Sequence, residues 1–263
     1  MRRYFIWIRY LGTHFSGWQI QPNAPTIQAS IEHALQQLLR LEKVSIVGCG
    51  RTDAGVHASS YVFHVDLPFI WDSKLSWRLN RMLGPDIVFT QFQEVNQSLH
   101  ARFSARKRTY KYLIDLEMPT FLQDCVFAYP YNPDQLNINL LKSAADLLLD
   151  YQEFFPFCKS KSEAEHYRCQ IYASEWKIIR NRYLVYRIEA NRFLRGMVRL
   201  IVGMCLGVAE GKIALSDVRK AMEQQVRLQK PYSAPAKGLF LYRVDYNDPQ
   251  IKSPPNGEIF FPI

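Results

Sequence analysis

Between two strand-like runs, residues 44–47 and 61–65, lies the stretch Gly48-Cys49-Gly50-Arg51-Thr52-Asp53-Ala54-Gly55-Val56-His57-Ala58. Three glycines within eight positions indicate a backbone that turns sharply or lies close to a ligand. Arg51 and Asp53 are two positions apart, so in an extended segment they share a face and can form an ion pair. A carboxylate kept charged in such a loop suits nucleophilic or general-base chemistry. The alternative is a purely structural turn, because glycine, aspartate and threonine are common in turns.

Composition and charge favour a folded protein with a polyanionic partner. The 263 residues are enough for one large domain or two small ones, and 48% hydrophobic residues predict a packed core. A formal charge of +9 favours nucleic acid, ahead of a membrane surface, as the partner. The longest apolar run, residues 200–209, is too short to span a bilayer. Arg9 interrupts the apolar run at the N-terminus, so we expect no signal peptide.

The cysteines and histidines predict neither a disulfide framework nor a metal site. The five cysteines form no Cys-x-x-Cys pair, and a reducing cytoplasm fits this pattern. His57 and His64 lie close in sequence to Asp53 and Asp66, but their spacing matches no metal-binding motif. We therefore expect no metal.

The hydrophobic pattern predicts alternating strands and helices. In the first half the predicted order is strand, helix, strand, strand, helix, strand, which is a split βαβ unit. The ranges are 4–10, 26–41, 44–47, 61–65, 73–83 and 87–95. The second half varies this pattern, with a helix at 136–150, a hairpin at 175–179 and 183–190, and a long helix at 195–210. The sequence therefore predicts an α+β fold.

Two further stretches carry clustered arginines. Residues 102–112 interleave cations with aromatic rings, a pattern that suits phosphates and stacked bases, although a charged strand edge would look similar. The long helix has an apolar face and a second face lined by Gly196, Gly203 and Gly207, which would allow close packing. Arg199 lies beside these glycines, where a solvated basic face is the simpler interpretation.

Five separated motifs resemble the tRNA pseudouridine synthase A family, over roughly residues 4–246. The most specific is Gly50-Arg51-Thr52-Asp53-Ala54-Gly55-Val56-His57-Ala58. The others are the glycine-punctuated segment 12–21, the segment 100–105 followed by 108–112, the segment 193–199, and the segment 233–241. The chain departs from the family pattern at Leu200, where asparagine is usual, and over residues 153–157.

The resemblance implies a role for individual residues. It makes Asp53 the catalytic carboxylate, Tyr110 the ring that stacks on the target uracil, and Arg199 the partner of the aspartate. It places segment 12–21 on an RNA-facing rim. We expect contacts with the substrate at Arg51, Thr52, Gln19, Arg106, Lys107 and Gly238.

The resemblance also implies a fold and a reaction. The fold would be two ferredoxin-like, RRM-like halves that share a continuous, mainly antiparallel sheet with a central cleft. The halves would be residues 1–115 and 116–246, with a Pro-rich tail at 247–263. The reaction would isomerise uridine to pseudouridine in the tRNA anticodon stem-loop, around positions 38–40.

Partners and alternatives follow from the same resemblance. It implies a cytoplasmic homodimer that needs no cofactor, metal or membrane. A catalytically inactive RNA-binding protein on the same fold is the alternative. A metal-dependent nuclease would share the basic charge, but the sequence lacks the carboxylate cluster that such an enzyme needs.

Overall fold

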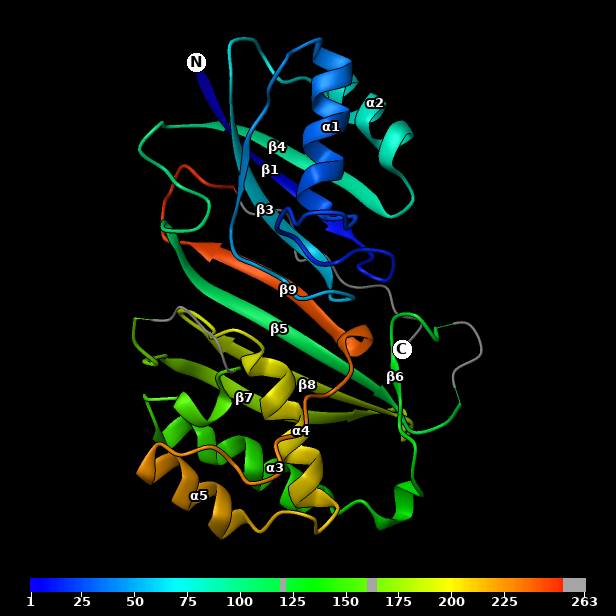
Figure 1. The fold of residues 1–263 in the computed structure, drawn as a ribbon, viewed down its shortest axis with the longest axis vertical. Helices are drawn as coiled ribbons and strands as arrows, with labels where there is room; N and C mark the ends of the chain where they lie inside the picture. Colours follow the sequence, from blue (N-terminus) through cyan, green and yellow to red (C-terminus); the bar gives the residue numbers. More distant parts are fainter. Residues whose placement is uncertain (119–121, 160–164, 253–263) are drawn as a thin grey trace. The chain divides into compact units, whose positions relative to one another are not determined.

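A computed structural model describes residues 1–118, 122–159 and 165–252, and it shows a mixed α+β fold (Figure 1). The strands form one large mixed, mostly antiparallel sheet in the order β4-β1-β3-β9-β5-β8-β7, with β2 beside β3 and β6 beside β5. The strands are β1 (Arg2–Tyr10), β2 (Ile46–Gly48), β3 (His57–Leu67), β4 (Ile87–Val95), β5 (Ala105–Asp115), β6 (Phe127–Ala128), β7 (Ile171–Ile179), β8 (Tyr183–Ala190) and β9 (Leu239–Tyr246). The α-helices are α1 (Ile27–Leu39), α2 (Ser73–Leu83), α3 (Ile138–Asp146), α4 (Met197–Ala209) and α5 (Leu215–Gln224). Short 3₁₀ turns lie at Pro133–Gln135, Leu147–Asp150, Phe155–Phe157 and Ala236–Gly238.

The chain groups into two compact units, each described here by itself. The first unit comprises Met1–Arg108 together with the segment from Phe240 onward, and the second comprises Thr109–Leu239. The part of the predicted tail that is described, residues 247–252, belongs to the first unit. There Lys252 donates its backbone N–H to Gln93 Oε1 at 2.9 Å. The rest of the predicted tail, residues 253–263, lies outside the described residues.

The first unit is built on the predicted split βαβ pattern. β1 pairs antiparallel with both β3 and β4, and β2 pairs antiparallel with β3. The strand order β4-β1-β3-β2 follows from these pairings. α1 and α2 cover one face of these strands (Figure 1).

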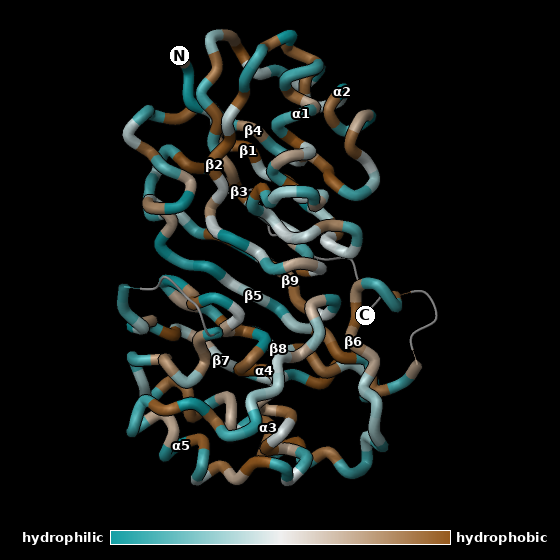
Figure 2. Tube along the Cα trace, in the orientation of Figure 1, coloured by the Kyte–Doolittle hydropathy of each residue, from teal (hydrophilic) through white to brown (hydrophobic). Residues whose placement is uncertain are grey.

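The predicted helices of the first unit are confirmed. The Thr26 side chain caps α1 by accepting from the Ala29 N–H, and Asp72 caps α2 by accepting from the Leu75 N–H at 2.7 Å. The apolar stripe of α1 is buried at Ile27, Ile31 and Leu35. Figure 2 shows that β1 and β3 are largely hydrophobic, whereas the first residues of β5 are hydrophilic.

β3 is longer than predicted and begins at His57 rather than Tyr61. The reason is a contact made by a distant segment: β9 pairs parallel with β3 at His57 and Ala58. The Phe240 ring stacks on the His57 imidazole with 4.7 Å between ring centroids. Two residues assigned to the loop from sequence are therefore the first residues of a strand.

The second unit confirms the predicted hairpin. β7 and β8 pair antiparallel around a three-residue connection, 180–182. Arg180 and Asn181 both have positive φ near 50°, and the Arg182 N–H donates to the Ile179 carbonyl, so they are the central residues of a tight turn. The predicted helix at 136–150 is α3 followed by a 3₁₀ turn, Leu147–Asp150. α5 was not predicted.

α4 differs from the predicted two-faced helix, because it is buried almost all round. A helix that is hydrophobic on every side belongs in a core. It begins at Met197, after Gly196 in the left-handed conformation, so Arg195 precedes the helix. The predicted close packing at the glycines is confirmed at Gly203, where a side chain would collide with the Tyr232 carbonyl oxygen. In the described part of the chain, no helix is long and apolar enough to span a membrane.

Candidate active site

The loop that carries Asp53 has a fixed backbone. The Thr52 carbonyl accepts the Trp18 N–H at 3.2 Å, and the Gly55 N–H donates to the Phe15 carbonyl at 3.2 Å. The Thr52 hydroxyl is buried and hydrogen bonded to the Tyr10 hydroxyl at 2.9 Å. Asp53 itself is half-buried. The backbone is therefore anchored on both sides of Asp53, and the Asp53 carboxylate stays partly accessible.

The glycine-punctuated segment 12–21 supplies this support. Gly17 has a φ of 95°, and a side chain there would collide with the Thr52 carbonyl oxygen. The Trp18 ring stacks on Tyr61 with 4.0 Å between centroids, and the Tyr61 hydroxyl donates to the Gly50 carbonyl at 2.5 Å. The segment thus supports the Asp53 loop, and Gln19, next to Trp18, is one of its exposed polar residues.

Arg51 does not meet Asp53 as the sequence suggested. Its side chain is exposed and, among the described residues, it makes no ion pair. Cys49, in the same loop, is buried, and burial raises the pKa of its thiol to about 11. The thiol is therefore protonated at neutral pH, and a thiol is a poorer nucleophile than a thiolate.

Arg108 ties the basic cluster to the Asp53 loop within the first unit. Its Nη2 donates to the Cys49 carbonyl at 3.0 Å and to the Arg102 carbonyl at 2.8 Å. One guanidinium therefore joins the start of the Asp53 loop to the turn at residues 100–104. Arg108 serves the fold, although the sequence suggested that it would bind phosphate.

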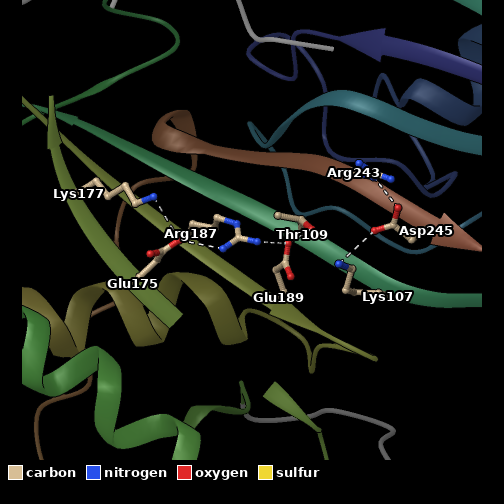
Figure 3. Close-up of polar contacts among 8 residues, drawn as sticks. All are labelled: Lys107, Thr109, Glu175, Lys177, Arg187, Glu189, Arg243 and Asp245. Atoms are coloured by element: carbon tan, nitrogen blue, oxygen red, sulfur yellow. Dashed lines mark hydrogen bonds and ion pairs between the residues drawn. The ribbon is translucent and has the colours of Figure 1, made fainter. Parts of the chain in front are cut away.

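Arg106 and Lys107 differ in how their charges are used. Arg106 is exposed. Lys107 forms an ion pair with Asp245 at 3.6 Å, and Asp245 also accepts from Arg243 at 2.5 Å (Figure 3). The Lys107 charge is partly neutralised within the protein, so Arg106 is the better candidate for a phosphate contact.

This difference predicts unequal effects on RNA binding. Arg106→Ala should reduce the slope of log affinity against log salt by about 0.7–0.9, the loss of one phosphate contact. Lys107→Ala should reduce it by roughly half of that or less, because Asp245 already competes for the ammonium group. Filter binding of one tRNA over a salt series measures both slopes. Equal slope changes would contradict the ranking.

Tyr110 lies in the second unit, on β5, and is half-buried. The Phe193 ring meets it edge to face, with 5.0 Å between centroids and an interplanar angle of 85°. The preceding residue, Thr109, donates its hydroxyl to Glu189 on β8 at 3.0 Å. Figure 3 shows that Arg187 forms ion pairs with both Glu189 and Glu175. These contacts fix the strand at Tyr110 and the orientation of its ring.

Arg199 lies in the first turn of α4 and is bound to the loop before β9. Its Nε donates to the Ala234 carbonyl at 2.6 Å, and the Ala234 N–H donates to the Arg199 carbonyl at 3.0 Å. The buried Tyr112 hydroxyl donates to the neighbouring Pro235 carbonyl at 2.8 Å. Gly238 is buried where a side chain would collide with the Leu113 carbonyl oxygen. These contacts therefore fix Arg199 and segment 233–238 relative to each other.

Comparison with known proteins identifies the family. A sequence profile described as tRNA pseudouridine synthase matches residues 6–104 and 147–247. The tRNA pseudouridine synthase A of Porphyromonas gingivalis is 40% identical, over 94% of this chain and 98% of its own. That of Bacteroides fragilis is 41% identical, over 94% and 97%, and tRNA pseudouridine synthase A 1 of Bacillus cereus is 36% identical, over 92% and 97%.

The chain belongs to the tRNA pseudouridine synthase A family. It is therefore a tRNA pseudouridine synthase, an isomerase with tRNA as its substrate. The matched stretches contain Asp53 and Arg199, and Tyr110 lies between them.

The residues predicted for this synthase divide between the units. The first unit holds Asp53, Arg51, Thr52, Gln19, Arg106 and Lys107, and the second holds Tyr110, Arg199 and Gly238. Thr52 and Gly238 are buried, and both support the backbone of their loops. Arg51, Gln19 and Arg106 are exposed. No group of three or more histidine, cysteine or acidic residues is arranged for a metal in residues 1–118, 122–159 and 165–252.

The two departures of this synthase from its family pattern lie together in the second unit. Leu200 lines an apolar pocket with Pro156, Phe157, Met204 and Tyr232. Sequence reasoning noted both departures but did not place the segment 153–157 beside Leu200, because this proximity depends on tertiary packing.

Restoring the residue usual in the family should destabilise this chain. Leu200→Asn puts an amide among apolar side chains and should lower the free energy of unfolding by about 1–3 kcal/mol. Leu200→Met, which keeps the volume, should cost less than about 1.5 kcal/mol. Urea unfolding of both variants measures this. An asparagine variant as stable as the wild type would show that the pocket accepts a polar group.

Proposed function

We propose that this synthase modifies uridines in the anticodon stem-loop of tRNA, around positions 38–40, with Asp53 as its catalytic carboxylate. The observation that carries the proposal is the Asp53 loop itself. It offers a half-buried carboxylate between two backbone anchors, the Thr52 carbonyl and the Gly55 N–H. A carboxylate held in this way can meet a sugar carbon without first reorganising the loop.

The proposed reaction breaks the C1′–N1 bond of the target uridine, turns the uracil and joins its C5 to C1′. Asp53 attacks the ribosyl carbon or stabilises the positive charge that develops there, and carboxylates do both at sugar centres. The base must leave its stack before this chemistry. Tyr110 would hold the flipped uracil by stacking on it.

Arg199 would pair with Asp53. Its bond to the Ala234 carbonyl fixes the direction of the guanidinium, which supports a positioning role. The exposed Arg51, Gln19 and Arg106 would contact the RNA, while Thr52 and Gly238 would shape the loops around it.

The proposal includes the arrangement of the halves. The strand order β9-β5-β8-β7 repeats the order β4-β1-β3-β2, which supports two ferredoxin-like halves. The repeat assigns β5 (Ala105–Asp115) to the second half, so it favours a boundary before β5 over the halves 1–115 and 116–246 expected from the sequence. A central cleft between the halves is part of the proposal. Residues 247–263 would form a tail. We also propose a cytoplasmic homodimer, and sedimentation of the purified protein tests the dimer.

Mapping the product tests the substrate assignment. Unmodified tRNA transcripts are incubated with the purified protein, and pseudouridines are located by chemical labelling and primer extension. We expect them on the 3′ side of the anticodon stem-loop. Pseudouridine confined to another arm of the tRNA would overturn the assignment.

A further inference from the structure

The outer face of α2 carries three cations and a tryptophan that the fold does not use. Leu75 and Leu79 are the buried residues of this helix. Lys74, Trp77, Arg78 and Arg81 are exposed and follow the spacing i, i+3, i+4, i+7, so they form one stripe about 10 Å long.

Trp77 is exceptional among the five tryptophans of the chain. Its side chain is 65% exposed, whereas the other four, Trp7, Trp18, Trp71 and Trp176, are at most 4% exposed. Two more apolar side chains nearby in sequence, Ile70 and Met82, are also exposed. Exposed apolar surface of this kind contributes nothing to folding, and such surfaces commonly mark interaction sites.

The charges of this face have one sign. α2 contains no acidic residue, and the Asp72 carboxylate before it is used to cap the helix. Lys74, Arg78 and Arg81 make no ion pair within the described part of the chain. α5 provides a contrast, because its exposed Arg219 and Lys220 lie between the acidic Asp217 and Glu223, and mixed charge of this kind is usual for a solvated helix.

We propose that the stripe Lys74–Trp77–Arg78–Arg81 is an RNA-binding surface of this synthase and contacts the tRNA apart from the Asp53 loop. Three uncompensated cations fit a phosphate backbone. An exposed indole between them fits an unstacked base. α2 supplies no residue to the candidate active site, so the stripe contributes binding and leaves the chemistry to other residues.

Quenching of tryptophan fluorescence tests contact directly. Trp77 should dominate quenching by acrylamide, since the other four rings are buried, and Trp77→Phe should remove most of it. Saturating full-length tRNA should protect the wild type from acrylamide. Quenching of Trp77 that is unchanged by saturating tRNA would overturn the proposal.

Binding measurements test the energetic role. Trp77→Ala should weaken tRNA binding by about 5-fold or more, the scale of one lost base stack. Lys74→Ala with Arg78→Ala should reduce the salt slope by roughly 1.5, the loss of two phosphate contacts. Single-turnover rates at saturating tRNA should stay within about 2-fold of the wild type. Circular dichroism and thermal melts check that the variants are folded.

A matched variant distinguishes a contact at this stripe from a general effect of positive charge on RNA binding. Arg219→Ala with Lys220→Ala removes two positive charges from α5. This variant should change the slope of log affinity against log salt much less than Lys74→Ala with Arg78→Ala does. Equal effects of the two double variants would overturn the proposal. So would a Trp77→Ala variant that dissociates a dimer while binding tRNA normally, since the stripe would then be a contact between copies of the chain.

Discussion

Asp53→Asn should abolish pseudouridine formation while leaving tRNA binding within several-fold of the wild type. The substitution keeps the size of the side chain and removes the negative charge and the nucleophilic oxygen. Loss of a group that attacks or stabilises the reacting carbon typically costs about 10⁴-fold or more in rate. The Asp53 loop should keep its shape, because the Thr52 and Gly55 backbone contacts do not involve the carboxylate.

Single-turnover assays with saturating enzyme measure this loss, and gel-shift titration measures binding. Glu42→Gln is the matched control, because it removes one exposed carboxylate from the same unit and should leave the rate unchanged. Turnover by Asp53→Asn within 10-fold of the wild type, with contaminating enzyme excluded, would contradict the assignment of Asp53. A variant that loses binding to the same extent as rate would show that Asp53 acts on affinity.

Local signals in the sequence were sufficient for much of the fold. The caps Thr26 and Asp72 set the starts of α1 and α2 because a side-chain acceptor for the first helical N–H groups is a local property. The β7–β8 hairpin was equally local. β3 and α4 were misjudged because their limits depend on distant partners, β9 for the start of β3 and the surrounding core for the buried faces of α4.

For the candidate site, too, the sequence predicted some features and missed those that depend on tertiary contacts. The motif around Asp53 pointed to the carboxylate, but the sequence cannot distinguish the buried Thr52, which bonds to Tyr10, from the exposed Arg51. The same limit applies to Arg108, whose guanidinium binds backbone carbonyls, and to Lys107, whose partner Asp245 lies more than a hundred residues away. Burial and pairing of charges are tertiary properties, so composition and motifs located the cluster without ranking its members.

Tyr110 has two proposed roles that two substitutions should separate. The ring would stack on the flipped uracil, and base–aromatic stacking contributes about 1–3 kcal/mol per base. In its phenolate form the side chain would accept the C5 proton after the new carbon–carbon bond has formed, which regenerates the hydroxyl. Tyr110→Phe keeps the ring, which the edge-to-face contact with Phe193 orients, and deletes only the hydroxyl. Tyr110→Ala deletes both.

If both roles are real, the phenylalanine variant should bind tRNA normally and form product at least about 100-fold more slowly, the scale of a lost general base. The alanine variant should lose activity and also bind more weakly, by about 5-fold or more, because the flipped base has no stacking partner. Single-turnover assays with tRNA affinity measured in parallel distinguish these outcomes. Tyr172→Phe, at an exposed tyrosine on β7, controls for loss of a hydroxyl elsewhere. Near wild-type turnover by Tyr110→Phe would leave stacking as the only role and assign the proton to water or to another residue, since the ring alone cannot accept it.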